Sequence, residues 1–479
     1  MKVVSRTARV SKRCSGIALL LLFAIASHAE EPLQKRVEKA LAKSKAFWGL
    51  KAVSLTNNST LVEINAGRFF VPASNTKLFS TALALMRLGP DYRFVTTVRQ
   101  EGDDLALIGG GDPSIAARKY PYDKDEPQGD ALAGIRQLAA QVAAAGIKIV
   151  QGDVIGDDTA WPFDPYPDGW SQDDALFEYG APVSALTIND NAFRITLTLS
   201  NPPGIILNPA LEYYTIHNRV SKGAEGRVRY ERDAGSRELR LSGVVTDRGW
   251  SQILAIDDPA LYAARAFKQE LERCGVAVKG TARARHRRLG EPCAPEVGTL
   301  VAKRTSPPLA QLLQVTDKVS QNLHAEIMLR EVGRVKRGEA TAAAGVEEMK
   351  LFLQEAGVER EQYHFVDGSG LSRLTLVTPD TIYRLLRHMN GSKLRDTWID
   401  LLPIGGEDGT LLSRFRDNKM EAKRVHAKTG SLSHVSGLSG YVDSGKYGRV
   451  AFSLLVNNYN EPTAEIRKVM DDIALMLAE

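Results

Sequence analysis

The stretch VPASNTKLFSTALALMRLGP at residues 71–90 restricts the fold and the chemistry more than any other part of the chain. Its apolar pattern predicts a helix from Ser74 to Leu88, and Gly89-Pro90 is a strong signal for the end of a helix. Ser74 and Lys77 form an S-x-x-K pair at the start of this helix. Because residues three apart share one face of a helix, the lysine amine can reach the serine hydroxyl.

The S-x-x-K pair suits nucleophilic catalysis. A serine hydroxyl attacks well only when a neighbouring base takes its proton. Lys77 can be that base if burial and a second cation lower its pKa. The start of the helix also directs backbone N–H groups toward the place where an oxyanion would form. Taken alone, the pair equally fits a serine that caps a helix and a lysine in solvent.

Two further motifs follow in the order found in β-lactamases and penicillin-binding proteins. SQN at 320–322 is an S-x-N motif that leads into a predicted helix at 323–332. KTG at 428–430 lies in a predicted strand that begins at His426. Each motif is weak alone, but the ordered set in fitting local structure favours an active-site-serine enzyme.

The catalytic roles follow from the chemistry of each side chain. We expect Ser74 to be the nucleophile and Lys77 to be its base. Lys428 would be the cation that lowers the pKa of Lys77, and Ser320 would relay a proton to the leaving amine. The backbone N–H groups of Ser74 and Ser431 would form an oxyanion hole.

The remaining motif residues are expected to bind substrate. Asn322 can hold a backbone amide of the substrate. Lys428, Thr429, Gly430 and Ser431 form one segment, in which the lysine and the two hydroxyls offer charge-assisted hydrogen bonds to a substrate carboxylate.

Both ends of the chain predict helices beside strands. Near the start, the pattern predicts a helix at 33–41 and strands at 49–56 and 60–64. Near the end, it predicts strands at 426–432, 435–442 and 449–457. A final helix follows, with the apolar stripe Ile466, Val469, Met470, Ile473 and Leu477. The pattern predicts an α+β domain, an antiparallel sheet flanked by helices, built from 30–95 and 301–479. Residues 96–300 would be an inserted β-rich region of one or two smaller domains.

Within this insert, the sequence predicts short strands at 95–99, 105–108, 195–199 and 237–245 and a helix at 131–145. The proline-rich stretch at 161–170 is expected to be a loop, because its prolines cannot sustain a helix or a strand ladder. Cys274 and Cys293 are the cysteines left after residue 29, and they could be bridged or free.

The first 29 residues have the parts of a secretory signal peptide. Five basic residues precede an apolar run at 17–26, and small residues end at Ala29 before Glu30-Glu31. The run is too short to cross a bilayer, so we expect cleavage near Ala29 and a periplasmic or otherwise secreted protein. Without 1–29 the chain has 57 basic and 57 acidic residues, which gives no electrostatic reason to expect nucleic acid as a partner.

Several other chemistries lack their motifs. The glycines at 109–111 have neither the third spaced glycine nor the Lys-Ser/Thr pair of a nucleotide loop, so they predict a tight turn. The sequence contains no H-E-x-x-H or Cys/His cluster for a metal and no G-x-S-x-G elbow of a Ser-His-Asp hydrolase.

The chain resembles the low-molecular-mass class C penicillin-binding proteins, the serine D-alanyl-D-alanine carboxypeptidase/endopeptidase family. The marks are VPASNTK at 71–77, GGGDPS at 109–114, APVSAL at 181–186, SQNLHAE at 320–326, DGSGLSR at 367–373, GGEDGTL at 405–411 and AKTGSL with GLSGYV at 427–442. The resemblance implies a transpeptidase-like domain split by two smaller inserted domains. It also implies that peptidoglycan peptides are the substrates and that β-lactams acylate the serine.

The same resemblance implies the reaction in more detail. The family cleaves the terminal D-Ala–D-Ala bond, and often the D-Ala–diaminopimelate cross-link, without metal or organic cofactor. Asp157 and Trp161 would contact the diaminopimelate side chain. Ser431, where threonine is usual, and Gln321 within S-x-N keep the required hydroxyl and backbone groups.

Two alternatives share the motif set. A β-lactamase would hydrolyse the acyl-enzyme quickly, but the 246 residues from Ser74 to Ser320 are a far longer step than β-lactamases have. A wall-binding or β-lactam-sensing protein would use the fold without catalysis, but Ser74, Lys77, Ser320 and Lys428 are all present. The sequence leaves open the balance of carboxypeptidase and endopeptidase activity, the oligomeric state and the third residue of the wall peptide.

Overall fold

The computed structural model describes residues 31–125 and 129–479. The predicted signal peptide at 1–29 lies outside the described residues. None of the helices in the described ranges is long and apolar enough to cross a membrane.

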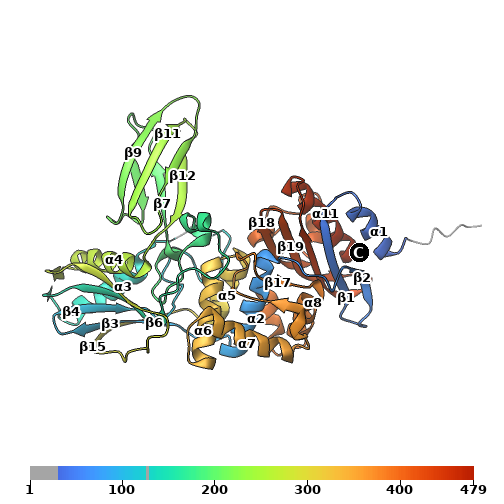
Figure 1. Cartoon of the computed structure of the whole chain (residues 1–479), viewed down its shortest axis with the longest axis horizontal. Helices are drawn as coiled ribbons and strands as arrows, with labels where there is room; N and C mark the ends of the chain where they lie inside the picture. The colour runs from blue at the N-terminus through green and yellow to red at the C-terminus, as the bar shows by residue number, and fades with distance from the viewer. Residues whose placement is uncertain (1–30, 126–128) are drawn as a thin grey trace, which may run out of the picture.

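One five-stranded antiparallel sheet joins the two ends of the chain, in the order β18-β19-β20-β1-β2 (Figure 1). Its strands are β1 (Phe47–Ser54), β2 (Thr60–Ile64), β18 (Val425–Leu432), β19 (Val435–Ser444) and β20 (Gly448–Asn457). The β1–β20 pairing, with Leu50 opposite Leu454, joins the halves that the insert separates. This arrangement confirms the predicted α+β fold.

The central strand β20 is buried on both faces. Val450, Phe452 and Leu454 pack toward α1 (Leu33–Leu41) and α11 (Thr463–Ala478), which cover one face of the sheet. Ala451 and Leu455, at alternate positions of the strand, pack into the helices of the other face. Because both faces are covered, the strand is apolar without a polar alternation.

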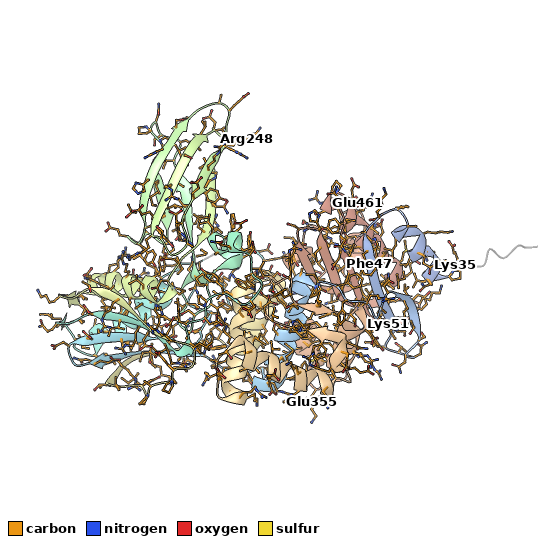
Figure 2. All side chains as sticks on the ribbon, viewed as in Figure 1. Lys35, Phe47, Lys51, Arg248, Glu355 and Glu461 are labelled. Carbon is orange, nitrogen blue, oxygen red and sulfur yellow. The ribbon has the colours of Figure 1, made fainter. Side chains whose placement is uncertain are left out.

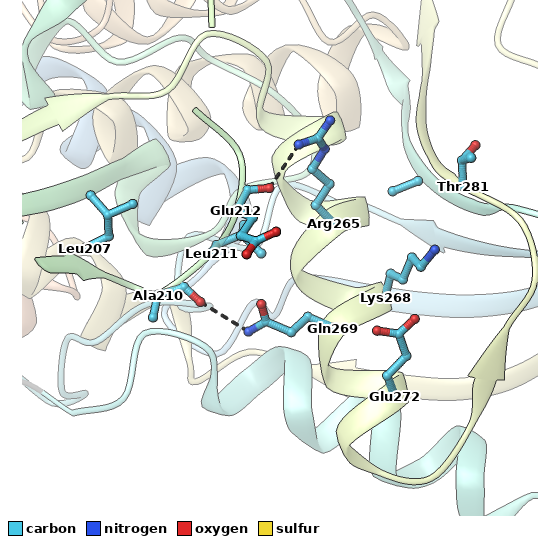
Figure 3. Close-up of a pocket in the computed structure, with 10 residues that line it drawn as sticks. Leu207, Ala210, Leu211, Glu212, Arg265, Lys268, Gln269, Glu272 and Thr281 are labelled. Atoms are coloured by element: carbon cyan, nitrogen blue, oxygen red, sulfur yellow. Dashed lines mark hydrogen bonds between the residues drawn. The ribbon is translucent and has the colours of Figure 1, made fainter. Parts of the chain in front are cut away.

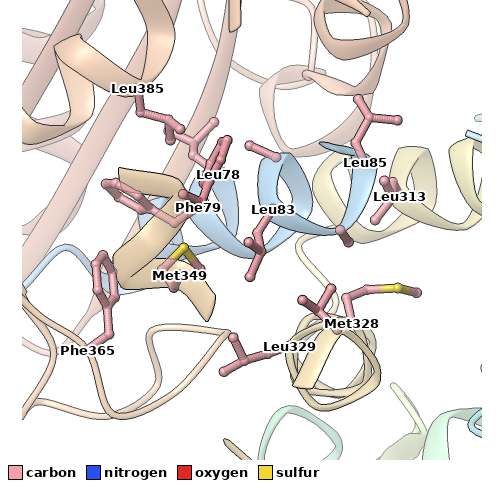
Figure 4. Packing of buried hydrophobic residues seen from close by; sticks show 14 of the residues in the cluster. Leu78, Phe79, Leu83, Leu85, Leu313, Met328, Leu329, Met349, Phe365 and Leu385 are labelled. Atoms are coloured by element: carbon pink, nitrogen blue, oxygen red, sulfur yellow. The ribbon is translucent and has the colours of Figure 1, made fainter. Parts of the chain in front are cut away.

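A helical layer covers the second face of the sheet and surrounds α2 (Lys77–Leu88), as Figure 4 shows. Its other helices are α5 (Leu309–Lys318), α6 (Asn322–Arg337), α7 (Ala342–Glu355), α8 (Pro379–Asn390) and α9 (Arg395–Leu401). Leu78, Phe79 and Leu83 of α2 pack against these neighbours with 0% exposure. The predicted helix at 74–88 is therefore the buried axis of this layer, but its first turn, η1 (Ala73–Thr76), is a 3₁₀ helix.

The inserted region contains a second five-stranded sheet, in the order β14-β6-β4-β3-β15. Its strands are β3 (Val95–Glu101), β4 (Asp104–Ile108), β6 (Val154–Pro162), β14 (Ala282–Arg287) and β15 (Thr299–Thr305), and α3 (Ala133–Ala144) and α4 (Pro259–Arg273) pack on it. Strand β15 pairs with β3 up to Thr305, past residue 300 where the sequence predicts the end of the insert. Helix α4 was not predicted.

A further β-rich unit leaves the chain between β6 and α4 and projects from the molecule (Figure 1). It has two three-stranded sheets, β12-β7-β8 and β10-β11-β9. The strands are β7 (Ala192–Leu197), β8 (Ile205–Asn208), β9 (Thr215–Lys222), β10 (Val228–Glu231), β11 (Glu238–Val245) and β12 (Trp250–Ala255). Figure 2 shows Arg248 near the far end of this projection. The projecting unit is thus itself an insertion, between β6 and α4, in the chain of the unit that contains the second five-stranded sheet.

The remaining elements are short. They are β5 (Ile149–Val150) paired with β13 (Ala277–Val278), β16 (Tyr363–His364) paired with β17 (Leu376–Val377), α10 (Lys419–Ala422), and the 3₁₀ turns η2 (Gln172–Leu176), η3 (Glu178–Gly180), η4 (Asn189–Asn191), η5 (Arg360–Gln362) and η6 (Gly409–Leu411).

The structure bears on two expectations for the insert, the loop at 161–170 and the state of the two cysteines. The prediction of a loop at 161–170 is wrong at its start, because Trp161 and Pro162 end strand β6. Pro162 is tolerated there because it lies at the strand end, beyond a register shift, where it pairs with Arg287. Of the two states open for Cys274 and Cys293, the structure has both thiols free.

The packing of α4 on β6 gives a test of the inserted sheet. A Cβ atom at Gly156 would lie 1.9 Å from the carbonyl oxygen of Ala260, far inside van der Waals contact. We expect Gly156→Ala to lower the free energy of unfolding by about 1–3 kcal/mol, measured from the urea midpoint. Gly67→Ala is the control, because no atom lies within 4 Å of its Cβ position. Equal midpoints for the two variants would contradict this packing.

Candidate active site

The amine of Lys77 lies at the centre of the site. Its side chain is 0% exposed, and Nζ lies 2.9 Å from Ser74 Oγ, 2.5 Å from Asn322 Oδ1 and 2.9 Å from the carbonyl oxygen of Ser369. A neutral amine has two N–H donors and one lone pair. Since Asn322 Oδ1 and the Ser369 carbonyl can only accept, a neutral Lys77 donates to these two and directs its lone pair at the Ser74 hydroxyl.

The turn that carries Ser74 has an unusual backbone. Ala73 has a φ of 48°, in the left-handed region that disfavours residues with a side chain by roughly 1–2 kcal/mol. Gly370 packs directly against this turn, and a Cβ atom at Gly370 would lie 1.9 Å from the carbonyl oxygen of Ala73. The DGSG segment at 367–370 therefore both supports the turn and supplies the Ser369 carbonyl to Lys77.

The second lysine, Lys428 of β18, is also 0% exposed. Its Nζ donates to Ser320 Oγ at 2.8 Å and to the carbonyl oxygen of Thr429 at 2.9 Å. Ser320 lies between α5 and α6 with a φ of 61°. The structure thus brings the three motifs together through three hydrogen bonds: Lys77 contacts Ser74 and Asn322, and Lys428 contacts Ser320.

Burial is the main influence on both amines. It holds the pKa of Lys77 well below the ordinary lysine value, and the nearby charge of Lys428 lowers it further. Burial also lowers the pKa of Lys428, while the carboxylate of Asp317 acts in the opposite direction. A lowered pKa makes the neutral, basic form of Lys77 available at a lower pH.

Two buried acids complete the electrostatics of the site. Burial raises the pKa of Asp317, at the end of α5, and of Glu326, in α6. Glu326 Oε1 accepts hydrogen bonds from the N–H groups of Gly368 and Ser369 at 2.9 and 2.8 Å. Glu326 therefore fixes the loop whose carbonyl orients Lys77.

Strand β18 lies very close to the turn that carries Ser74. A Cβ atom at Gly430 would lie 2.7 Å from the carbonyl oxygen of Pro72 and 3.2 Å from the backbone nitrogen of Ser74. Glycine at this position allows the strand to approach the turn, so that the backbone of Ser431 lies beside Ser74.

Two cavities open at Ser74, and Ser74, Ser320 and Ser431 line both. The first, which we call the acidic cavity, has a volume of about 500 Å³ and is also lined by Gly169, Ser171, Asp173, Asp174, Tyr179, Asn322, Gly370, Leu371, Arg373, Leu432 and Ser433. The second, which we call the arginine cavity, has a volume of about 330 Å³ and is also lined by Thr410, Ser413, Arg414, Thr429 and Arg467. The site can therefore hold groups on both sides of the serine.

The insert forms part of the acidic cavity. Asn322 Nδ2 donates to the carbonyl oxygen of Tyr179 at 2.7 Å, and Trp170 Nε1 donates to Asp367 Oδ2 at 3.2 Å. These bonds hold the loop around η2 and η3 over the motif residues.

Asp157 and Trp161 do not line either cavity. The Asp157 carboxylate is 2.9 Å from Arg285 Nη1, and it also accepts hydrogen bonds from Thr159. Trp161 is 2% exposed, and its ring lies where a side chain on Gly111 would lie. Asp157 is engaged within the insert, whereas Trp161 packs in the core of the helical layer and lines a separate cavity of about 960 Å³. Neither side chain borders Ser74, and the expected contact of both with the diaminopimelate side chain stays a prediction.

The sequence reasoning did not identify several residues that the structure brings to the site. These are Asp173, Asp174 and Arg373 in the acidic cavity, Arg467 in the arginine cavity, and the buried Asp317 and Glu326. A signal existed for Glu326, which is one helical turn after Asn322 and therefore on the same helix face. No comparable local pattern marks Arg467.

Another cavity, of about 750 Å³, lies on α4 away from the motifs (Figure 3). Arg265 Nη1 donates to the carbonyl oxygen of Glu212 at 3.0 Å, and Gln269 Nε2 donates to that of Ala210 at 3.3 Å. These contacts tie α4 to the segment after β8. The polar side chains of Arg265 and Gln269 therefore serve to hold two parts of the insert together.

Comparisons with known proteins identify relatives along most of the chain. The profile of the D-Ala-D-Ala carboxypeptidase 3 (S13) family matches residues 33–479. A D-alanyl-D-alanine carboxypeptidase from an Actinomadura species is 33% identical over 461 residues, which cover 91% of this chain and 81% of that protein. The D-alanyl-D-alanine carboxypeptidase DacB of Haemophilus influenzae is 26% identical over 431 residues, covering 86% and 85%.

Solved structures show the same fold. The crystal structure of penicillin binding protein 4 (dacB) from Haemophilus influenzae aligns with a TM-score of 0.78 at 24% identity, covering 92% of this chain and 99% of that one. A crystal structure of that protein complexed with a β-lactam aligns with a TM-score of 0.73 at 23% identity and the same coverage.

The proximity of the two lysines predicts a pH effect. Lys428→Met removes a buried positive charge that lowers the pKa of Lys77, so we expect the pKa of Lys77 to rise. Because only neutral Lys77 can accept a proton, the rise of the acylation rate with pH should move to higher pH. The measurement is the rate of acylation by a fluorescent penicillin across a pH series. Lys423→Met, an exposed charge near Glu407, is the control. A shift to lower pH would contradict the coupling.

Proposed function

This chain belongs to the D-Ala-D-Ala carboxypeptidase 3 (S13) family of serine peptidases, and from that premise we propose that Ser74 is its nucleophile on peptidoglycan stem peptides. The observation that carries this assignment is the set of contacts around Lys77 Nζ. Two acceptors that cannot donate, Asn322 Oδ1 and the Ser369 carbonyl, direct the amine lone pair at Ser74 Oγ.

In the acylation step, Ser74 Oγ attacks the carbonyl carbon of the penultimate D-Ala while Lys77 takes the hydroxyl proton. The backbone N–H groups of Ser74 and Ser431 stabilise the oxyanion, and the close approach of Gly430 to the nucleophile turn supports this role. Losing one such donor typically costs about 2.7–4 kcal/mol of transition-state stabilisation.

The intermediate then collapses as the bond to the leaving amine breaks. Ser320 gives a proton to that amine and regains one from Lys428, whose Nζ lies 2.8 Å from its Oγ. The products are free D-Ala and an acyl-enzyme on Ser74. The proton that Lys77 took from Ser74 passes to Lys428, which leaves both lysines in their starting protonation states. Water then hydrolyses the ester: Lys77 takes a proton from the water and returns it to Ser74 Oγ as the ester bond breaks.

Asn322 can hold the substrate backbone while it orients Lys77. Its Oδ1 faces Lys77 and one N–H of Nδ2 is bound to the Tyr179 carbonyl. The second N–H of the amide remains for a substrate carbonyl.

The acidic cavity supports a more specific proposal about the acyl side of the substrate. Its charged lining residues are Asp173, Asp174 and Arg373. Two carboxylates beside one guanidinium complement a group that carries both an ammonium and a carboxylate. We therefore propose that the third residue of the stem peptide is a diamino acid with a free amino and carboxyl group, as in diaminopimelate.

We further propose that the enzyme is also a D,D-endopeptidase. In a cross-link, D-Ala is joined to the amine of the third residue of a neighbouring stem peptide. The cavities on both sides of Ser74 would hold the acyl group in the acidic cavity and the leaving residue in the arginine cavity. We place the mature protein in the periplasm or outside the cell, on the basis of the leader-like sequence at 1–29.

The function is tested by digestion of purified muropeptides and by mass spectrometry of the products. We expect loss of the terminal D-Ala from pentapeptides and conversion of cross-linked dimers to monomers. Penicillin should block both reactions and label the tryptic peptide that contains Ser74. Ser74→Ala should abolish the label and the products. A label on another serine would overturn the assignment, and D-Ala release without dimer cleavage would remove only the endopeptidase proposal.

The acidic cavity has its own test. The double variant D173N/D174N should lower kcat/KM by roughly fivefold for a peptide with a free amine on its third residue, because partly exposed charge pairs contribute up to about 1 kcal/mol. The same peptide acetylated at that amine should be nearly unaffected. Asp168→Asn, an exposed acid in the same loop that does not line the cavity, is the control. Equal losses on both peptides would contradict recognition of the ammonium.

A further inference from the structure

The arginine cavity raises the question of which cation meets the leaving group. If the proposed reaction is correct, the leaving residue carries a free carboxylate next to its departing amine. Lys428 is poorly placed to face this group, because it is 0% exposed and its Nζ donates to Ser320 Oγ and the Thr429 carbonyl. A cation on the wall of the cavity would be better placed.

Two arginines line the cavity, and their surroundings differ. Arg414 forms an ion pair with Asp471 at 2.6 Å, and its Nε contacts both carboxylate oxygens of that residue. Its charge is therefore already balanced. Arg467 of α11 is exposed and has no ion pair within residues 31–125 and 129–479.

The guanidinium of Arg467 is nevertheless held in place. Its Nη2 donates to Ser431 Oγ at 3.0 Å, so the side chain lies along β18 beside the K-T-G motif. The carbonyl oxygen of Arg467 also accepts a hydrogen bond from Arg414 Nη2 at 3.2 Å, which fixes this part of α11. The remaining N–H donors of the guanidinium form no other hydrogen bond within the described part of the chain.

Hydroxyl groups stand next to this guanidinium. Ser431 and Thr429 line the same cavity as Ser74, and Thr429 Oγ1 donates to Thr410 Oγ1 at 2.8 Å. A planar guanidinium with neighbouring hydroxyls matches a carboxylate, which accepts two parallel N–H bonds.

We propose that Arg467 is a specificity-determining residue that binds the free carboxylate of the leaving residue, together with the hydroxyl of Ser431. Lys428 then keeps its contact with Ser320 throughout the reaction. The leaving residue of a pentapeptide and that of a cross-link both carry this carboxylate, so Arg467 acts in both reactions. This inference rests on the proposed function of Ser74.

The test compares two substrates that differ only at the leaving group, a stem peptide ending in D-Ala-D-Ala as the free acid and the same peptide as its C-terminal amide. The wild type should prefer the acid. In Arg467→Gln the ratio of kcat/KM for acid over amide should fall by roughly fivefold, as expected for loss of a solvent-exposed charge pair. Arg467→Lys should retain part of the preference.

The matched control is Lys468→Gln, which removes an exposed positive charge from the next position of α11, outside the cavity lining. It should keep the wild-type ratio. Thermal unfolding and penicillin labelling of Ser74 show that each variant is folded. An unchanged ratio in Arg467→Gln, an equal fall in Lys468→Gln, or a wild type that treats acid and amide alike would overturn the proposal. Failure of the proposed function is distinct, because the wild type would then release no D-Ala.

Discussion

The buried amine of Lys77 is the constraint on which the site depends. An amine with 0% exposure must have its hydrogen-bonding groups satisfied by the protein, and Ser74, Asn322 and Ser369 do this from three segments of the chain. Those segments are far apart in sequence, so the amine is in place only when both halves of the transpeptidase-like part have assembled. The β1–β20 pairing makes that assembly possible.

The charges around Lys77 explain why its proton can move. Lys428 and burial favour the neutral amine, whereas the buried carboxylates of Asp367, Asp317 and Glu326 favour the charged one. Opposing influences in a space of low polarity leave the two protonation states closer in energy than they are for a lysine in water. A base that must accept a proton and later release it works best with such a balance.

Features that depend on neighbouring residues could be predicted from the sequence, whereas features that depend on long-range contacts could not. The S-x-x-K, S-x-N and K-T-G residues and the strands of the main sheet follow from motif chemistry and apolar patterns, and the fold agrees. The predicted substrate contacts of Asp157 and Trp161 rest on the family resemblance alone, and they stay predictions; in the structure Asp157 pairs with Arg285 across β6 and β14. Arg467 could not be found, because only the packing of α11 beside β18 brings it to Ser431.

The side-chain amide of Asn322 links the insert directly to Lys77. Asn322 Oδ1 is bound to Lys77 and its Nδ2 to the Tyr179 carbonyl, so both ends of the side chain are fixed. A shift of the loop that carries Tyr179 would rotate the amide and disturb the orientation of Lys77, because the planar amide moves as one unit. The loop that contributes the acidic lining of the cavity is therefore also a positioning element for the base. In the proposed reaction, substrate recognition on the acyl side and activation of Ser74 would therefore depend on the same segment of the insert.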